Sequence, residues 1–111
     1  MKHIAVVTTV ASRAQAQSMA RALVERKLVA CAQISEIESY YHWHGALQHE
    51  PEFRILCKTT AERYAEVERA IKELHAYELP AIHAYAMDPI YGPYAAWIED
   101  ELEGRAGKLR T

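Results

Sequence analysis

A long run of strand-forming sequence constrains the fold of this chain more than any other feature. Residues 28–44 are apolar at first and then, from Glu36 onward, alternate between two faces. Turn-forming residues follow over 45–51, and a second strand is expected over 53–60. The pattern therefore predicts a long β-hairpin with Pro51 at an edge or a bulge. Its first strand would span roughly 55 Å at ~3.3 Å per residue, whereas a helix of about 15 residues covers only ~22 Å. The hairpin must therefore project beyond the helices that pack against it.

The remaining elements flank this hairpin in an order that defines the fold class. Apolar residues with helical spacing, at i, i+3, i+4 and i+7, precede the hairpin and also follow it. The expected strands cover 1–9, 28–44, 53–60 and 81–87, and the expected helices cover 13–27, 61–74 and 94–102. This order predicts an α+β protein with a ferredoxin-like, split β-α-β-β-α-β sandwich, both main helices on one face, a long β-hairpin and a short C-terminal helix.

Local signals predict where the two main helices begin and end. Ser12 and Gln15 have the spacing of a capping box at the start of the first helix, and Thr59 and Glu62 have the same spacing before the second. Pro80 is expected to end the second helix, because proline cannot continue a helix.

Length and composition exclude several classes of protein. The chain has 111 residues, which predicts a single domain over 1–104 followed by a basic C-terminal tail over 105–111. No apolar stretch approaches the roughly 20 residues of a membrane-spanning helix, and the N-terminus does not resemble a leader peptide, so we expect a cytoplasmic protein without membrane contact. Thirteen basic and fifteen acidic residues give no general attraction to phosphate backbones, which argues against nucleic acid as a partner.

The projecting part of the hairpin is rich in aromatic residues. Tyr40, Tyr41 and Trp43 would form an exposed apolar patch if they were left in water. A domain this small also buries only about 60 to 70% of the surface that its unfolded chain exposes. Both points favour self-association.

Five sequence blocks resemble the divalent-cation tolerance protein CutA family. They are LVACAQI at 28–34, YYHWHG at 40–45, CKTT at 57–60, HAYELPAI at 75–82 and YAAWI at 94–98, in the order and spacing of that family. The resemblance implies a ferredoxin-like subunit in a tight homotrimer, with long hairpins shared between subunits. It also implies a non-enzymatic role in tolerance of copper and other divalent metals.

The strongest candidate metal ligands are a histidine, a glutamate and a cysteine. His75 and Glu78 lie three residues apart next to a helix end and could bind Cu(II) or another divalent cation such as Zn(II). The alternative is a histidine that interacts with the helix C-terminus and a glutamate that forms a salt bridge. Cys31 matches the family's cysteine and could supply a soft thiolate, but a small buried hydrophobic residue in a central strand is the preferred interpretation.

Further family-matched residues are expected to line a cleft or an interface between subunits, and their alternative role is plain packing. They are Trp43, Lys58, Tyr77, Tyr94 and Trp97. The chain departs from the family pattern at three places. Ala76 stands where a proline is usual after the histidine, and Thr8 and Leu74 stand where some members have a cysteine and a second histidine. A copper site built from all of those positions is therefore not carried over whole.

Three other functions remain open from the residues. His42 and His44 alternate on a strand and could chelate a metal with His49, although a solvated hairpin face explains them as well. Cys31 could be a nucleophile with His75 as its base, if the two side chains touch. A trimeric regulatory protein that binds a small metabolite or anion in intersubunit clefts, with Lys58 as the counter-charge, is the last alternative.

Overall fold

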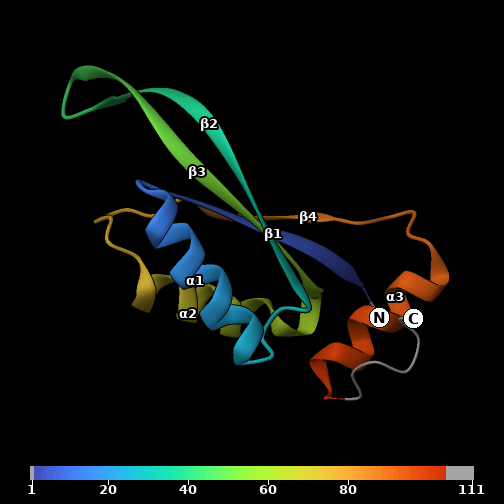
Figure 1. Cartoon of the computed structure of the whole chain (residues 1–111). Coiled ribbons are helices and arrows are strands. Elements are labelled where there is room, and N and C mark those ends of the chain that lie inside the picture. Colours follow the sequence, from blue (N-terminus) through green and yellow to red (C-terminus); the bar gives the residue numbers. More distant parts are fainter. Residues whose placement is uncertain (1, 105–111) are drawn as a thin grey trace.

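The computed structural model describes residues 2–104, and the expected basic tail over 105–111 lies outside them. The elements are β1 (His3–Val10), α1 (Arg13–Glu25), β2 (Cys31–Trp43), β3 (Ala46–Thr60), a 3₁₀ turn (Ala61–Arg63), α2 (Tyr64–Leu74), β4 (Ile82–Ala86) and α3 (Gly92–Leu102). Within this range an antiparallel four-stranded sheet, ordered β2-β3-β1-β4, has α1 and α2 on one face (Figure 1). The predicted ferredoxin-like α+β fold is confirmed.

The core forms where α1 and α2 pack on the sheet. The Ser12 hydroxyl accepts a hydrogen bond of 3.1 Å from the Gln15 backbone N–H, as the first capping signal predicts. Val24 lies at the margin of the buried helix face, with 39% of its surface exposed. The core consists of apolar residues from β1, α1, β3 and α2, chiefly Ile4, Val6, Val10, Ala16, Met19, Leu23, Ile55, Cys57, Val67, Ala70 and Ile71.

The hairpin projects beyond the rest of the sheet. β1 ends opposite Phe53, but β2 and β3 stay paired for seven more residue pairs, beginning with Ile37 and Glu52. We call residues 37–52 the hairpin arm; its strands extend about 23 Å at ~3.3 Å per residue. Pro51 lies in the arm, where β3 has a single neighbouring strand among residues 2–104, so the predicted edge position is confirmed. The overhang expected from the sequence is present (Figure 1).

The turn of the hairpin is shorter than the sequence suggests. Turn chemistry was expected over 45–51, but β3 already begins at Ala46. His44 and Gly45 form the turn with φ values of 52° and 79°. Positive φ at both central residues is the geometry of the tight type I′ turn, whose twist matches that of the flanking strands. The expected long loop is wrong because a histidine adopts the left-handed conformation here.

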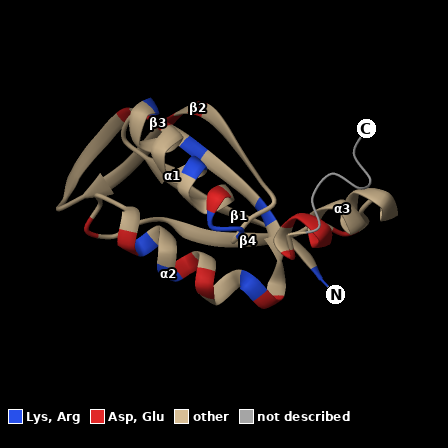
Figure 2. Ribbon diagram, turned by 60° about the horizontal axis from the view of Figure 1, so that its bottom comes forward, with Lys and Arg blue, Asp and Glu red and all other residues tan. Residues whose placement is uncertain are grey.

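Two expectations about α2 are also wrong. The Thr59 hydroxyl donates to the Leu28 carbonyl at 2.8 Å instead of capping a helix, so Thr59 and Glu62 do not form a capping box. The helix ends at Leu74, as the expected range of 61–74 predicts, but Pro80 is not what ends it, because His75 is already extended. Acidic and basic residues are distributed along α2 (Figure 2), as is usual for a helix with one solvated face.

The third helix lies at the end of the sheet opposite the hairpin arm (Figure 1). His3 Nε2 is 2.7 Å from a carboxylate oxygen of Glu99, which connects α3 to the start of β1. Ala30, Ile98 and Leu102 form a second small buried cluster there. No helix within residues 2–104 is both long and apolar enough to cross a membrane.

The turn geometry gives a testable prediction. We expect Gly45→Ala to lower the free energy of unfolding by about 1–2 kcal/mol, because a residue with a Cβ atom is strained at this positive φ. Gly92→Ala is the matched control: its Cβ would also meet nothing within 4 Å, but its φ is ordinary. Urea denaturation of both variants measures the difference. Equal stability of the two variants would contradict the proposed turn strain.

Candidate functional site

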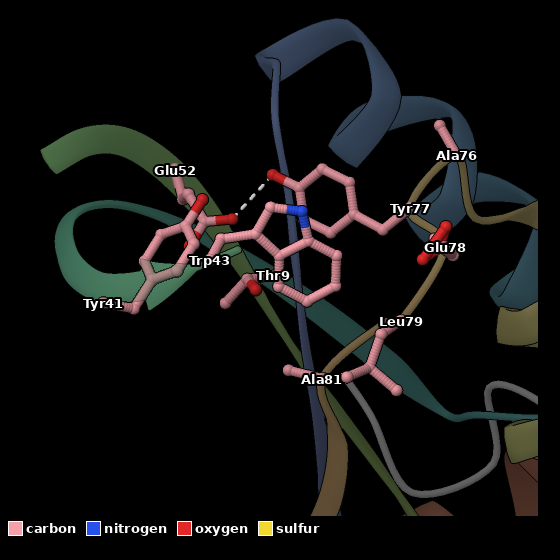
Figure 3. Close-up of a pocket in the computed structure, with 9 residues that line it drawn as sticks. All are labelled: Thr9, Tyr41, Trp43, Glu52, Ala76, Tyr77, Glu78, Leu79 and Ala81. Atoms are coloured by element: carbon pink, nitrogen blue, oxygen red, sulfur yellow. Dashed lines mark hydrogen bonds between the residues drawn. The ribbon is translucent and has the colours of Figure 1, made fainter. Parts of the chain in front are cut away.

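A cleft of about 490 Å³ lies between the base of the hairpin arm, the end of β1 and the loop over 75–81. Its lining residues are Thr9, Tyr41, Trp43, Glu52, Ala76, Tyr77, Glu78, Leu79 and Ala81 (Figure 3). The arm provides one wall because it continues past the last residue of β1, and the loop after α2 provides the other. The cleft therefore exists only because the hairpin is longer than its neighbouring strands.

His75 fixes the position of the loop wall. Its Nε2 is 2.8 Å from the Thr9 carbonyl oxygen, and the Tyr77 backbone N–H donates to its Nδ1 at 3.1 Å. A carbonyl oxygen only accepts and a backbone N–H only donates, so the ring has its proton on Nε2. Both ring nitrogens are thus occupied in the single chain. His75 could bind a metal only after one of these hydrogen bonds breaks.

Glu52 is a buried carboxylate in the wall of the cleft. Only 7% of its surface is exposed, and the Tyr77 hydroxyl donates to it at 2.6 Å (Figure 3). Burial, and then this hydrogen bond, raises the pKa of Tyr77 well above its usual value. The phenol therefore remains protonated at neutral pH and continues to donate. Sequence reasoning missed Glu52, because only the strand register places it just beyond the end of β1 and beside Tyr77.

A second tyrosine and carboxylate pair lies on the same side of the arm. The Tyr41 hydroxyl donates to Glu50 at 2.7 Å, and this hydrogen bond raises the pKa of Tyr41. Two carboxyl groups, those of Glu52 and Glu78, line the cleft. None of the lining residues is a lysine, arginine or histidine. The part of the cleft built by residues 2–104 therefore has two carboxyl groups and no basic side chain.

The other family-matched residues lie at the far end of the sheet. Cys31 is paired with Lys58 across β2 and β3. Lys58 Nζ is 5.2 Å from the centre of the Tyr94 ring, which stacks on Trp97 with 5.7 Å between the ring centres. The structure thus divides the candidate residues into two groups. We call His75, Glu78, Trp43 and Tyr77 the arm group, and Cys31, Lys58, Tyr94 and Trp97 the α3 group.

This division excludes a Cys31 and His75 dyad within one chain. Cys31 is level with Lys58, which faces Ala5 on β1, whereas His75 bonds to Thr9, four residues further along. That separation is about 13 Å along the strand at ~3.3 Å per residue, far beyond hydrogen-bond reach. Cys31 also begins an edge strand, so its expected position in a central strand is wrong. The other cysteine, Cys57, is fully buried, and burial raises its pKa to about 12.

The hairpin histidines do not form the metal-binding cluster that was considered as an alternative to a solvated face. His44 lies in the turn, so it does not alternate with His42 on one strand face. His49 stacks on Tyr40, with 4.0 Å between the ring centres, and is 3.8 Å from Glu38. Across residues 2–104, no group of three or more histidine, cysteine, aspartate or glutamate side chains is arranged to hold a metal ion.

These features define a class of protein: a ferredoxin-like domain with a projecting β-arm and an acidic, aromatic cleft beside the arm. Residues 4–101 match the family model described as CutA1 divalent ion tolerance protein. The chain belongs to this family.

Individual relatives agree with the family match. The divalent-cation tolerance protein CutA of Archaeoglobus fulgidus is 33% identical over 101 residues, which cover 91% of this chain and 99% of that protein. The CutA protein of Thermococcus kodakarensis is 35% identical over 104 residues, covering 94% and 100%.

Solved structures of CutA proteins have the same fold. The Archaeoglobus fulgidus structure has a TM-score of 0.88 at 32% identity, covering 90% of this chain and 98% of that one. CutA1 from the psychrotrophic bacterium Shewanella sp. SIB1 has a TM-score of 0.85 at 33% identity, covering 89% and 94%. The Archaeoglobus protein is described as periplasmic, so the cytoplasmic location expected for this chain stays a prediction.

The Tyr77 contact gives a second prediction. We expect Tyr77→Phe to lower the free energy of unfolding by about 1–3 kcal/mol at neutral pH, because the buried Glu52 carboxylate loses its donor. Tyr85→Phe is the control, since Tyr85 is 61% exposed and its removal should change stability by less than about 0.5 kcal/mol. Urea denaturation at pH 7 measures both.

The same contact makes a pH-dependent contribution. A folded-state pKa above the unfolded value of about 10 means that the native state holds the Tyr77 proton more tightly. This stabilisation is fully present below pH ~10 and is lost as the pH rises through the folded pKa. The wild type should therefore lose stability above pH ~10 more steeply than Tyr77→Phe. Parallel stability curves for the two proteins would contradict this assignment.

Proposed function

We propose that this protein is a homotrimer that binds divalent cations, copper among them, and acts in cation tolerance as a binding protein and not as an enzyme. The family membership supports the tolerance role. The single observation that supports a site shared between subunits is the separation of the candidate ligands into the arm group and the α3 group at opposite ends of one sheet.

The arm favours assembly. Tyr40 and Leu47 are 64% and 65% exposed, and Trp43 is 40% exposed. Burying such side chains stabilises an interface, and aromatic residues often contribute most of its energy. Along residues 46–52, the side of β3 that faces away from β2 has no partner strand within the described chain. An unpaired edge of this kind readily accepts a strand from another copy. A closed ring of three copies would cover every arm equivalently.

Assembly could also complete a metal site. Glu78 and His75 lie on the loop beside the arm, so a contact between this end of one copy and the α3 end of the next would bring them toward Cys31 of that copy. Carboxylate, imidazole and thiolate together suit copper or zinc. His75 would exchange its hydrogen bond to Thr9 or to Tyr77 for the metal. This arrangement accounts for a family role in cation tolerance together with an incomplete ligand set in each described chain.

Mixed assemblies test the proposal. We expect Cu(II) binding, measured by calorimetry in a non-chelating buffer, to weaken strongly in Cys31→Ser and in Glu78→Gln. When the two variants are unfolded together and refolded as an equimolar mixture, a shared site is intact at about a quarter of the interfaces of a ring, because one copy supplies Glu78 and the next supplies Cys31.

The controls separate this result from general effects. Cys57→Ala should leave binding unchanged, because Cys57 is fully buried in the core. Glu38→Gln removes an exposed carboxylate from the arm without touching the proposed ligands. Failure of the mixture to regain any sites would contradict the shared site, and unchanged Cu(II) binding in both single variants would contradict these ligands altogether.

A further inference from the structure

Glu52 lacks a cationic partner within one chain. Only 7% of its surface is exposed, and its hydrogen-bond donor is the neutral Tyr77 hydroxyl. Within residues 2–104, no basic side chain forms a salt bridge with its carboxylate. A carboxylate that is buried without a positive partner is costly, because the charge has lost its hydration. A cation from outside the chain would therefore stabilise Glu52.

Lys58 has the opposite deficiency at the other end of the same strand. Its ammonium nitrogen lies 5.2 Å from the centre of the Tyr94 ring, and none of the salt bridges within residues 2–104 includes it. Along β3, Lys58 and Glu52 are about 20 Å apart at ~3.3 Å per residue. The two charges therefore do not meet within one chain.

Both side chains lie on the face of the sheet that is opposite α1 and α2. Ile55 and Cys57 of β3 belong to the core beneath those helices. Side chains alternate along a strand, so residues 52, 54, 56 and 58 share the other face. This face has an acidic group beside the arm and a basic group beside α3. A second copy that packs its α3 end against the arm end of the first would bring the two charges together.

We propose that Lys58 of one copy pairs with Glu52 of the next in the assembled protein. The inference rests on the proposed assembly but not on metal binding. Complementary charges fix the register in which two surfaces meet. Cys31 lies directly opposite Lys58 on β2, and Glu78 lines the same cleft as Glu52. The pair would therefore hold the proposed metal ligands of the two copies next to each other.

A double-mutant cycle tests the pair. Glu52→Gln, Lys58→Met and the double variant are compared with the wild type by sedimentation velocity over a dilution series. The buffer contains EDTA, so that metal ions play no part. We expect each single change to raise the concentration at which the assembly dissociates at least about tenfold. The double variant should dissociate no more readily than the weaker single variant, because the pair is lost only once.

The distance within one chain makes this cycle specific for a contact between copies. Substitutions about 20 Å apart with no shared partner have additive effects, so coupling between these two sites can only arise across an interface. Lys72→Met is the matched control: it removes a lysine from α2, on the other side of the sheet, and its effect should add to that of Glu52→Gln.

Arg54→Met tests the nearer cation on the same face of β3. Two results in an assembled wild type would overturn the pair and leave the proposed assembly standing. One is additive or absent effects of Glu52→Gln and Lys58→Met, and the other is coupling of Glu52→Gln to Arg54→Met in place of Lys58→Met. A wild type that sediments as a single chain would overturn both the pair and the assembly.

Discussion

The continuous hydrogen-bonded ladder between β2 and β3 is the interaction on which the rest of the structure depends. It runs past the end of β1, so the two strands form an arm with which no other strand of residues 2–104 pairs. The tight turn at His44 and Gly45 keeps the strands in register to the tip. The wall of the cleft, the exposed aromatic residues and the open strand edge all follow from that extra length.

The cleft at the base of the arm is built around polar groups with specific partners. His75 uses both ring nitrogens to hold the loop wall against β1, and Tyr77 on that loop donates to the buried Glu52. The loop that follows α2 therefore contacts the arm through the side chain of Tyr77.

Much of the fold could be predicted because it depends on local periodicity. The α1 stripe, the long hairpin and the element order are visible in the spacing of apolar residues, and the overhang follows from comparing strand and helix lengths. The expectations that were wrong depend on single residues whose partner or conformation the sequence pattern does not determine. Thr59 has the spacing of a helix cap, yet its hydroxyl donates to Leu28, 31 residues away in sequence. Gly45 indicates a turn, but the pattern does not show that His44 joins it.

The candidate site was harder to predict than the fold. The family blocks identified residues of both groups, but sequence alone does not reveal that Cys31 and His75 lie at different ends of one sheet. Glu52 escaped notice because its importance comes from the register, which places it beside Tyr77 just beyond β1. Function in such a protein depends on where strands end relative to one another, and a single sequence contains no direct signal of that.

Sedimentation velocity tests whether the hairpin arm joins one copy of the protein to another. The wild type should sediment at about three times the mass of one chain down to low micromolar concentration. Trp43→Ala should dissociate on dilution, because the Trp43 side chain, 40% exposed in one chain, would be buried in the proposed interface. Tyr91→Ala, which removes an aromatic side chain that is 75% exposed and outside the arm, should remain assembled. A wild-type protein that sediments as a single chain would contradict the account.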